Sequence, residues 1–545
     1  MSRPTQVTVM GKPVNVPWTA VDRVVDYLSP QRGAARYAAR FQAAIYGGGG
    51  GYSSADKSRP ANVHGNVAEL DADSAILPDL QTLRESSQNL ARNNCLASGA
   101  LDTSVARVVG NGIFPKPKID RDILNLSDDE AEKFEVAAER EYLRVTESRE
   151  FDAERHVPFS VWQGQAWYSV LRDGDALVNL PRFSRPGSDA KLKVQLVPAA
   201  RLSNPQGKLD TKELVAGVKK DRWGAPERYY ISRFHPGNRL GWRYLADRKT
   251  EQWQSLQAFD DDGSPLVLHL FDKKEGGQTR GVPYLSPVIE LIKQLGRYTD
   301  SEVMAAVVSA MLTLFVESDN GDIGLPHRGS DATITNGEVA DDLKKVDFDM
   351  GAIVGLPAGK KITVAESKRP SQNFEPFFKA ICDQIGVALG QPGILLTKDF
   401  SEANYSSMKA AFEDAWAFFM NRRTWLVKML CQPVYELVIA EAVANGRLSA
   451  PGFFRSDAIR RAWCGALWQG DAKPVLDDTK AVKAAVEMIE AGIATIDEMS
   501  RKLTGVPFAE KLPQILKERR ELRKEGKNPD EVFLPKDDDE EAENE

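Results

Sequence analysis

The sequence predicts an α+β fold in which a strand-rich region is followed by several long helices. Residues 155–275 carry paired strand patterns, whereas residues 286–316, 374–390 and 405–444 carry long apolar patterns at helical spacing. The chain has 545 residues and exceeds the ~250–300 residues that one hydrophobic core supports. We therefore expect several subregions rather than one core.

Residues 1–60 are expected to form a semi-independent arm. Arg32, Arg36 and Arg40 follow at four-residue spacing, which places them on one face of a predicted helix. Five glycines at 47–51 then supply a flexible link. The basic stripe fits a solvated helix face, and it also fits contact with an acidic partner.

The next region changes from helix to strand. Residues 75–110 show helical periodicity. We expect one hairpin around Asp173-Gly174, a second around residues 223–226, and a further strand at residues 265–271.

The first long helix is predicted to begin at Ser286-Pro287, a pair suited to the N-cap and first helical position. It runs to about Val316, and thirty residues at 1.5 Å each give roughly 45 Å. The turn at 319–321 ends it. Residues 320–370 then hold short β-like runs rich in Gly, Asp and Lys.

Two further helices follow this insert. One covers residues 374–390, and the other runs from Tyr405 to Ala444 with Pro433 inside it, where a kink or break is expected. The helices before and after the insert form a hairpin with too much apolar surface for a slender monomer. Neighbouring copies should cover that surface, and head-to-tail contacts that close on themselves give a ring.

The last region is again helical, over residues 477–526. Thr495 and Glu498 have the spacing of a capping box. The final stretch, KDDDEEAENE, is an acidic tail that we expect to be disordered.

Composition limits the function classes. The formal net charge is -7, which argues against gripping nucleic acid through a basic surface, although nucleic acid could still slide past. The four widely spaced cysteines indicate reduced, mostly buried thiols. There is no signal-peptide pattern, and the longest uncharged run that is mainly apolar, residues 303–316, is shorter than the ~20 residues of a membrane span, so no membrane partner is expected.

No active site or cofactor site is visible in the sequence. GxSxG, HExxH and Walker A motifs are absent, and the five histidines have no metal-ligand spacing. The acidic clusters at 261–263 and 318–322 have the character of turns, and His269 that of a core residue. A metal-dependent DNA-processing enzyme, using carboxylates at 317–322 or 341–349, remains an alternative.

Four stretches resemble the lambda-type family of tailed-bacteriophage portal proteins. In order along residues 30–505 they are LARNNCLASGALDTSVARVVGNGI (90–113), GQTRGVPYLSPVIELIKQLGRYTDSE (277–302), FFKAICDQIGVALGQPGILLTKDFSEANYSSMKAAF (377–412) and DDTKAVKAAVEMIEAGIATIDEM (477–499). The most specific part is Arg280-Gly281-Val282-Pro283 together with Asp399-Phe400-Ser401 and Asn404-Tyr405-Ser406-Ser407. Met408-Lys409 and LPAGK (356–360) depart from the family pattern; the first keeps the positive charge, and the second changes a charge in that insert.

The resemblance implies a portal fold with an α/β wing, a long-helix stem, a small β-containing clip, a kinked tunnel helix and an α-helical crown. On this scheme the chain divides into an arm and linker (1–60), wing (61–282), stem helix (283–319), clip (320–370), second stem helix (371–390), tunnel loop (391–404), tunnel helix (405–446), return to the wing (447–475), crown (476–527) and acidic tail (528–545).

The family also implies a function. It predicts a ring of about twelve copies at one capsid vertex, which passes double-stranded DNA during packaging and ejection, nucleates procapsid assembly and docks head–tail connector proteins. The expected partners are further copies of the chain, DNA without sequence preference, the terminase large subunit, connector or adaptor proteins, and major capsid and scaffold proteins. The expected location is the virion, with the host cytoplasm during assembly. A tail or baseplate ring without a DNA channel is the main alternative.

Candidate residues follow from these assignments. The DNA-facing loop and helix start would contain Lys398, Asp399, Phe400, Ser401, Glu402, Asn404 and Lys409. The clip would use Asp341, Asp342, Lys344, Lys345, Lys360 and Lys361 to dock terminase and adaptor, and Arg32, Arg36 and Arg40 could contact capsid or scaffold. The mixed charges of the loop predict weak contacts with DNA, since twelve strongly basic loops would trap it. Phe400 could face the duplex or pack against a neighbouring copy.

Overall fold

The structure is a computed structural model that describes residues 6–9, 12–15, 69–238, 253–311, 315–317, 354–356, 374–401, 404–473 and 478–524. The chain separates into two units, Met1–Asp71 and Ala72–Glu545. In the first unit, β1 (Gln6–Val9) and β2 (Lys12–Asn15) form an antiparallel hairpin. All other described elements belong to the second unit and are α+β in character.

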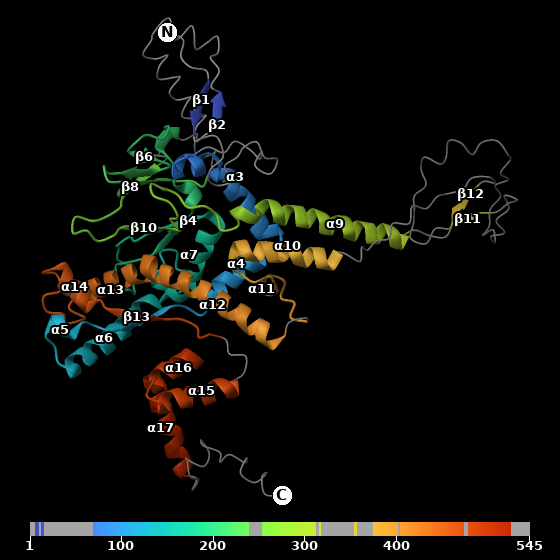
Figure 1. Ribbon diagram of the computed structural model, residues 1–545. Coiled ribbons are helices and arrows are strands. Elements are labelled where there is room, and N and C mark those ends of the chain that lie inside the picture. The colour runs from blue at the N-terminus through green and yellow to red at the C-terminus, as the bar shows by residue number, and fades with distance from the viewer. Residues whose placement is uncertain are drawn as a thin grey trace, which may run out of the picture. The chain divides into compact units, whose positions relative to one another are not determined.

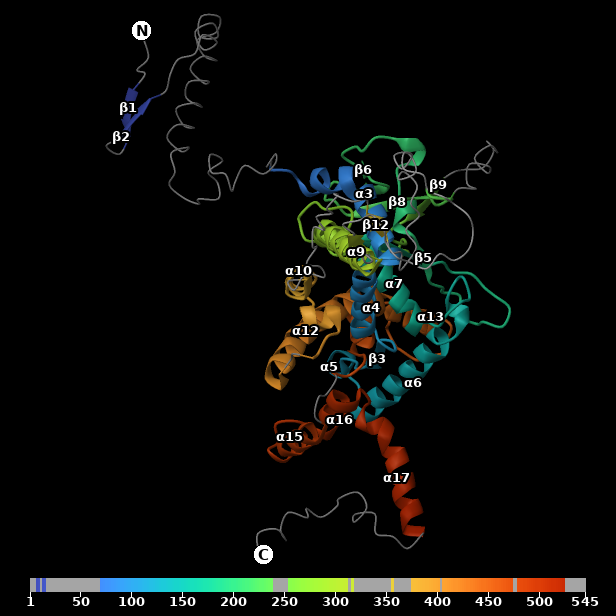
Figure 2. The same ribbon diagram turned by 90° about the vertical axis from the view of Figure 1, so that its right-hand side faces the viewer.

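Helix α4 (Cys95–Val108) lies at the centre of the second unit, between α7 (Phe159–Asp173) and α12 (Tyr405–Leu426) (Figure 2). Its side chains Ala97, Ala100 and Leu101 are fully buried, as expected for a helix that packs against both α7 and α12. Asn94 caps its start by accepting a hydrogen bond from Ala97 N at 3.0 Å.

The second unit contains further helices. They are α3 (Ala72–Asn93), α5 (Arg121–Leu124), α6 (Asp128–Thr146), α14 (Asp457–Trp463) and the 3₁₀ turns η3 (Arg149–Phe151), η4 (Ala199–Arg201) and η5 (Pro205–Gly207). Helix α6 starts with a complete capping box between Ser127 and Glu130.

The hairpin predicted around Asp173-Gly174 is wrong. Residues 159–173 form helix α7, because Trp167, Val170 and Leu171 bury one helical face in the core. Gly174 has a positive φ of 90° and ends that helix, and the strand begins only afterwards.

Two antiparallel sheets carry most of the strands. One has the order β10 (Val267–Phe271), β4 (Asp175–Asn179), β5 (Gln195–Val197), and the other the order β6 (Leu214–Val215), β7 (Val218–Lys220), β8 (Pro226–Ser232), β9 (Trp253–Gln257). The predicted hairpin near residues 223–226 is confirmed as the β7–β8 connection, where Asp221 accepts hydrogen bonds from Trp223 N and Ala225 N at 2.8 Å each. The strand predicted at 265–271 is β10.

Two shorter pairings join segments that are distant in sequence. Strand β3 (Phe114–Pro117) pairs antiparallel with β13 (Ala466–Gln469), which returns the chain to the body after the long helices. Strand β11 (Phe315–Glu317) pairs in parallel with β12 (Val354–Leu356).

Helices α9 (Ile289–Met311) and α10 (Phe374–Leu389) lie side by side (Figure 1). Tyr298 holds them together, since its ring stacks on Phe374 at 5.6 Å between centroids and meets Phe377 edge-on at 5.2 Å. The prediction of a helix to Val316 is wrong at its end, because Phe315–Glu317 pairs with β12 instead.

The predicted N-cap at Ser286 is also wrong. Residues 286–288 form the 3₁₀ turn η6 (Ser286–Val288), and Leu285 occupies the cap position. The Ser286 amide already donates to Pro283 O at 3.0 Å, so Ser286 lies inside the first turn. Its hydroxyl is buried and has no hydrogen-bond partner among the described residues.

The predicted helix over residues 405–444 is confirmed as one continuous run of α12, the π-helical turn η8 (Val427–Cys431) and α13 (Gln432–Ala444). A short helix, α11 (Gly393–Thr397), precedes it. After β13 come α15 (Asp478–Glu490), α16 (Ile496–Thr504) and α17 (Phe508–Lys524). The capping box at Thr495 and Glu498 is confirmed.

Candidate functional site

The candidate site is the segment that joins α10 to α12, and its root is buried. Gln391 is 1% exposed, and its side-chain amide donates to Ala100 O at 3.0 Å and to the Tyr284 hydroxyl at 3.3 Å. Gly386 and Gly393 allow α10 and α11 to approach closely, since a Cβ on Gly386 would lie 2.3 Å from Gln391 O. Part of the predicted loop 391–404 is therefore helix α11, fixed against the body.

The tip of this segment, Lys398–Ser401, is exposed and held by local hydrogen bonds. Lys398 caps α11 in the left-handed conformation, with φ of 57°. The Asp399 carboxylate accepts from Ser401 N at 3.1 Å and from Ser401 Oγ at 2.6 Å. These bonds, with the Lys379 ammonium at 3.6 Å, lower the pKa of Asp399, so its negative charge is retained at neutral pH.

Phe400 lies at the same tip and is 46% exposed. Its ring centroid is 6.2 Å from that of Phe412 in α12, so the Phe400 ring lies partly against α12 and partly in solvent. Glu402 lies outside the described residues.

The segment ends where Asn404 caps α12. Its side chain accepts a hydrogen bond from Ser407 N at 2.8 Å, which fixes the angle at which the tip joins the helix. Lys409 is exposed on the second turn of α12, and Glu413 and Asp414 are exposed one turn later. The exposed start of α12 is thus mixed in charge rather than basic.

Two arginines that follow on α12 are turned toward the body. Arg423 donates to Val108 O at 2.8 Å and to Arg107 O and Asp471 O at 3.0 Å each. Arg422 forms an ion pair with Asp272 at 2.7 Å. These cations hold the helix in place and do not add to a basic outer face.

Pro433 lies in the first turn of α13, directly after the π-helical turn. The amide of Gln432 donates to Val427 O, five residues back, and Pro433 has no amide hydrogen to continue the α-helical pattern. The helix changes its hydrogen bonding here, and the expected break does not occur, because α12, the π-helical turn and α13 follow one another without a gap.

A second exposed feature is apolar and lies on α9 and α10. Val303 is 56% exposed, Met304 61% and Val387 85%. Single exposed apolar residues are ordinary, but these side chains are distributed along two packed helices that project from the body (Figure 1). Such a surface is typical of a contact face between protein chains.

A buried charge cluster, which sequence reasoning missed, connects the sheets to the start of these helices. Asp175 is fully buried and accepts from Arg280 Nε and from Arg84 Nη2 at 2.6 Å each. Arg280 also donates to Leu202 O, Ala216 O and Ala199 O at 2.8–3.0 Å. The Arg-Gly-Val-Pro motif is therefore a structural one, and its arginine joins three separate segments.

The charges in this cluster compensate one another. Burial alone would raise the pKa of Asp175, but the Arg280 and Arg84 guanidinium groups and His269 hold it well below its usual range. His269 Nε2 lies 3.1 Å from Asp175 Oδ2, and burial lowers the pKa of His269. The prediction that His269 is a satisfied core histidine is confirmed.

The lowered pKa of His269 predicts a pH dependence of stability. The unfolded chain takes up a proton at this residue near pH 6.5, while the folded chain resists it, so stability should fall as the pH drops below about 6.5, by up to about 1.4 kcal/mol per pH unit. Urea unfolding at pH 7.5, 6.0 and 5.0 measures this. The His269→Gln variant should show a flatter profile, whereas His235→Gln, at the surface, should retain the wild-type slope. Equal slopes for all three proteins would contradict this role.

Neither a metal-binding cluster nor a membrane-spanning helix is found among the described residues. No group of three or more His, Cys, Asp or Glu side chains within the described ranges could hold a metal ion. No helix in the part of the chain that the structure covers is long and apolar enough to cross a membrane. Of the thiols, Cys382, Cys431 and Cys464 are buried as predicted, whereas Cys95 is exposed.

Several predicted site residues lie outside the described residues. These are Arg32, Arg36, Arg40, Asp341, Asp342, Lys344, Lys345, Lys360, Lys361 and Glu402, together with most of both acidic clusters at 317–322 and 341–349. The structure brings Lys398, Asp399, Phe400 and Ser401 together at one tip, with Asn404 and Lys409 at the start of the adjoining helix.

The chain was compared with family models, curated proteins and solved structures. A family model described as "Phage portal protein, lambda family" matches residues 60–423. The portal protein of Escherichia phage N15 is 25% identical over 508 residues, which cover 90% of this chain and 92% of that protein. Portal protein B of Escherichia phage lambda is 24% identical over 507 residues, with the same coverage of both. A chain from the neck of a native gene transfer agent particle aligns at 13% identity with a TM-score of 0.35, over 79% of this chain and 94% of that chain.

Proposed function

The chain belongs to the lambda family of phage portal proteins, and from this premise we propose that it forms a closed ring, of about twelve copies, that passes double-stranded DNA at one vertex of the capsid. The chain is then a component of the virion at the junction of head and tail, and is made and assembled in the host cytoplasm. We assign residues 61–282 to the wing, 283–319 and 371–390 to the stem, 320–370 to the clip, 391–446 to the tunnel loop and helix, and 476–527 to the crown.

The observation that carries the ring is the exposed apolar surface of α9 and α10. Covering Val303, Met304 and Val387 with a neighbouring copy removes apolar area from water, at roughly 25 cal/mol per Å². If the surface of one copy meets a different surface of the next, the contact is head-to-tail, and repetition gives a ring.

The exposed tip and the start of α12 suit contact with sliding DNA. Lys398 and Lys409 alternate with Asp399, Glu413 and Asp414, so the segment offers little net positive charge to the phosphates. Duplex DNA binds basic surfaces by releasing counterions, and a balanced surface avoids this tight, salt-dependent binding. The contacts would be weak and independent of sequence.

Force and docking must come from other proteins. The sequence contains no nucleotide-binding motif, so we propose that the terminase large subunit supplies the energy for packaging and docks at the clip. Head–tail connector proteins would take the same position afterwards. Contact of the arm with major capsid and scaffold proteins would allow the ring to nucleate procapsid assembly.

End-on electron microscopy and native mass measurement of the purified chain test the ring. We expect closed rings near twelve copies, with an aperture that passes a DNA duplex. Monomers under all conditions would refute the ring, and an aperture far narrower than a duplex would favour a structural ring without a channel.

A loop replacement tests the channel assignment. Replacing residues 398–403 with a Gly-Ser linker of the same length should leave ring formation unchanged, because Gln391 and Asn404 still anchor both ends. We expect at least a tenfold loss of packaged or retained DNA, measured as nuclease-resistant DNA per particle. The control replaces the exposed turn residues Arg222 and Trp223 with Gly-Ser. Full DNA retention by the loop variant would exclude the tunnel-loop role.

A further inference from the structure

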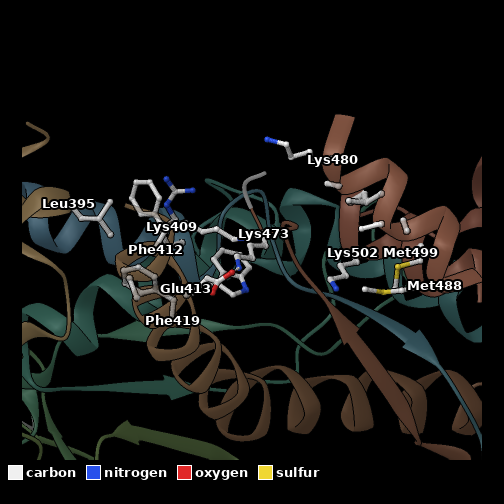
Figure 3. A pocket seen from close by; sticks show the side chains of 17 residues that line it. Leu395, Lys409, Phe412, Glu413, Phe419, Lys473, Lys480, Met488, Met499 and Lys502 are labelled. Atoms are coloured by element: carbon white, nitrogen blue, oxygen red, sulfur yellow. Dashed lines mark hydrogen bonds and ion pairs between the residues drawn. The ribbon is translucent and has the colours of Figure 1, made fainter. Parts of the chain in front are cut away.

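A pocket of about 450 Å³ lies between α12 and the pair α15–α16. Figure 3 shows Leu395, Phe412 and Phe419 on one side of it, and Met488 and Met499 on the other. The walls are therefore mainly apolar and come from two parts of the chain that are about 80 residues apart in sequence.

The rim of this pocket is basic. Five cationic side chains line it, and Glu413 is the one carboxylate among the lining residues. The cations are Arg107, Lys409, Lys473, Lys480 and Lys502. Lys473 lies 3.2 Å from Glu413, and the described lining residues include four more cationic side chains than carboxylates. An apolar floor with a basic rim suits a ligand that is apolar in one part and acidic around it.

We propose that residues 530–545 of the same chain dock in this pocket. This segment, DEVFLPKDDDEEAENE, contains nine carboxylate side chains and one lysine. Val532, Phe533 and Leu534 are its only large apolar side chains, and they stand between acidic residues on both sides. The apolar triplet matches the apolar walls, and the acidic flanks match the basic rim.

The length of the chain allows this return. Helix α17 has 17 residues and is about 25 Å long. Residues 525–532, when extended, span about 27 Å at ~3.4 Å per residue, which brings Val532 back to the start of α17. That end is fixed to α16, because Asp497 Oδ1 accepts from Phe508 N at 2.8 Å, and α16 contributes Met499 and Lys502 to the pocket.

Burial of the triplet gives the contact its free energy. A fully buried Val, Phe or Leu side chain contributes roughly 1.5–3 kcal/mol relative to water, before the cost of ordering the segment. The ion pairs at the rim contribute less, because exposed pairs are worth about 0–1 kcal/mol each. Raised salt should therefore weaken the docking without abolishing it. This inference does not depend on the proposed ring.

Disulfide trapping in the full chain tests the proposal. In a Cys95→Ser background, the pair Met488→Cys and Phe533→Cys should form a disulfide within one chain on mild oxidation. The control pair, Leu209→Cys and Phe533→Cys, places the partner at a side chain that is 87% exposed and far from the pocket in sequence. We expect the pocket pair to react at least tenfold faster. The added changes Lys480→Glu and Lys502→Glu should slow it.

Each outcome decides the question. Equal rates for both pairs would overturn the proposal. Disulfides between chains would show that the pocket binds the C-terminal segment of a second copy instead. If the Met488→Cys variant does not fold, a peptide of residues 528–545 can be titrated into a chain that ends at Lys527. Saturable binding that is lost with Phe533→Ser in the peptide supports docking, and no binding at low salt refutes it.

Discussion

Replacing Asp175 with alanine should lower the free energy of unfolding by roughly 3–5 kcal/mol. The change leaves the buried guanidinium groups of Arg280 and Arg84 without the carboxylate that compensates them. Such a buried, uncompensated charge is among the most costly defects that one substitution produces. Equilibrium unfolding in urea, followed by circular dichroism, measures the change.

The matched control is Asp189→Ala. Asp189 also forms an ion pair, with Arg144 at 2.9 Å, but its side chain is 60% exposed. Exposed pairs contribute about 0–1 kcal/mol, so this variant should unfold close to the wild-type midpoint. Equal losses in the two variants would show that the buried cluster has no special role in stability.

Met304→Asp and Val387→Asp should each prevent ring formation while the single chain stays folded. Both side chains are largely exposed in one copy, so a carboxylate costs little there. In the proposed ring they are covered, and each interface would bury an unpaired charge. A loss of roughly 3 kcal/mol per interface weakens each contact more than a hundredfold.

Native mass spectrometry at fixed protein concentration measures the distribution of oligomers. Met304→Leu and Val387→Ile keep the surfaces apolar and should retain rings, which separates the effect of charge from that of shape. Rings of wild-type abundance in both aspartate variants would place the subunit contact elsewhere on the chain.

The sequence predicted best where local signals agree with burial. The run from Tyr405 to Ala444 has a long apolar pattern and a strong N-cap, Asn404, and its extent is as expected. The capping box at Thr495 is likewise local, because both of its hydrogen bonds lie within four residues.

Local signals failed where distant residues decide. Asp173-Gly174 is a good hairpin turn, but Gly174 here ends a helix whose apolar face is covered by α4. The Arg280–Asp175 pair joins residues 105 positions apart, and no spacing in the sequence links them. A charged residue is also expected at the surface by default, so the buried cluster left no readable pattern.

The candidate site was predictable in composition but not in shape. The sequence shows an exposed phenylalanine among polar residues at Phe400, but no local pattern indicates its contact with Phe412 of the same chain. The buried root at Gln391 was also missed, because glutamine is usually exposed and its partners, Ala100 and Tyr284, come from distant segments.

The π-helical turn sets the rotational phase of α12 against α13. It contains one residue more than a regular turn would need, and each residue of an α-helix rotates the chain by roughly 100°. Deleting one residue from Val427–Cys431 would therefore swing all of α12, carrying buried Ala415 and Phe419 toward solvent. The number of residues in the turn Val427–Cys431 therefore determines which side chains of α12 face the body and which face outward.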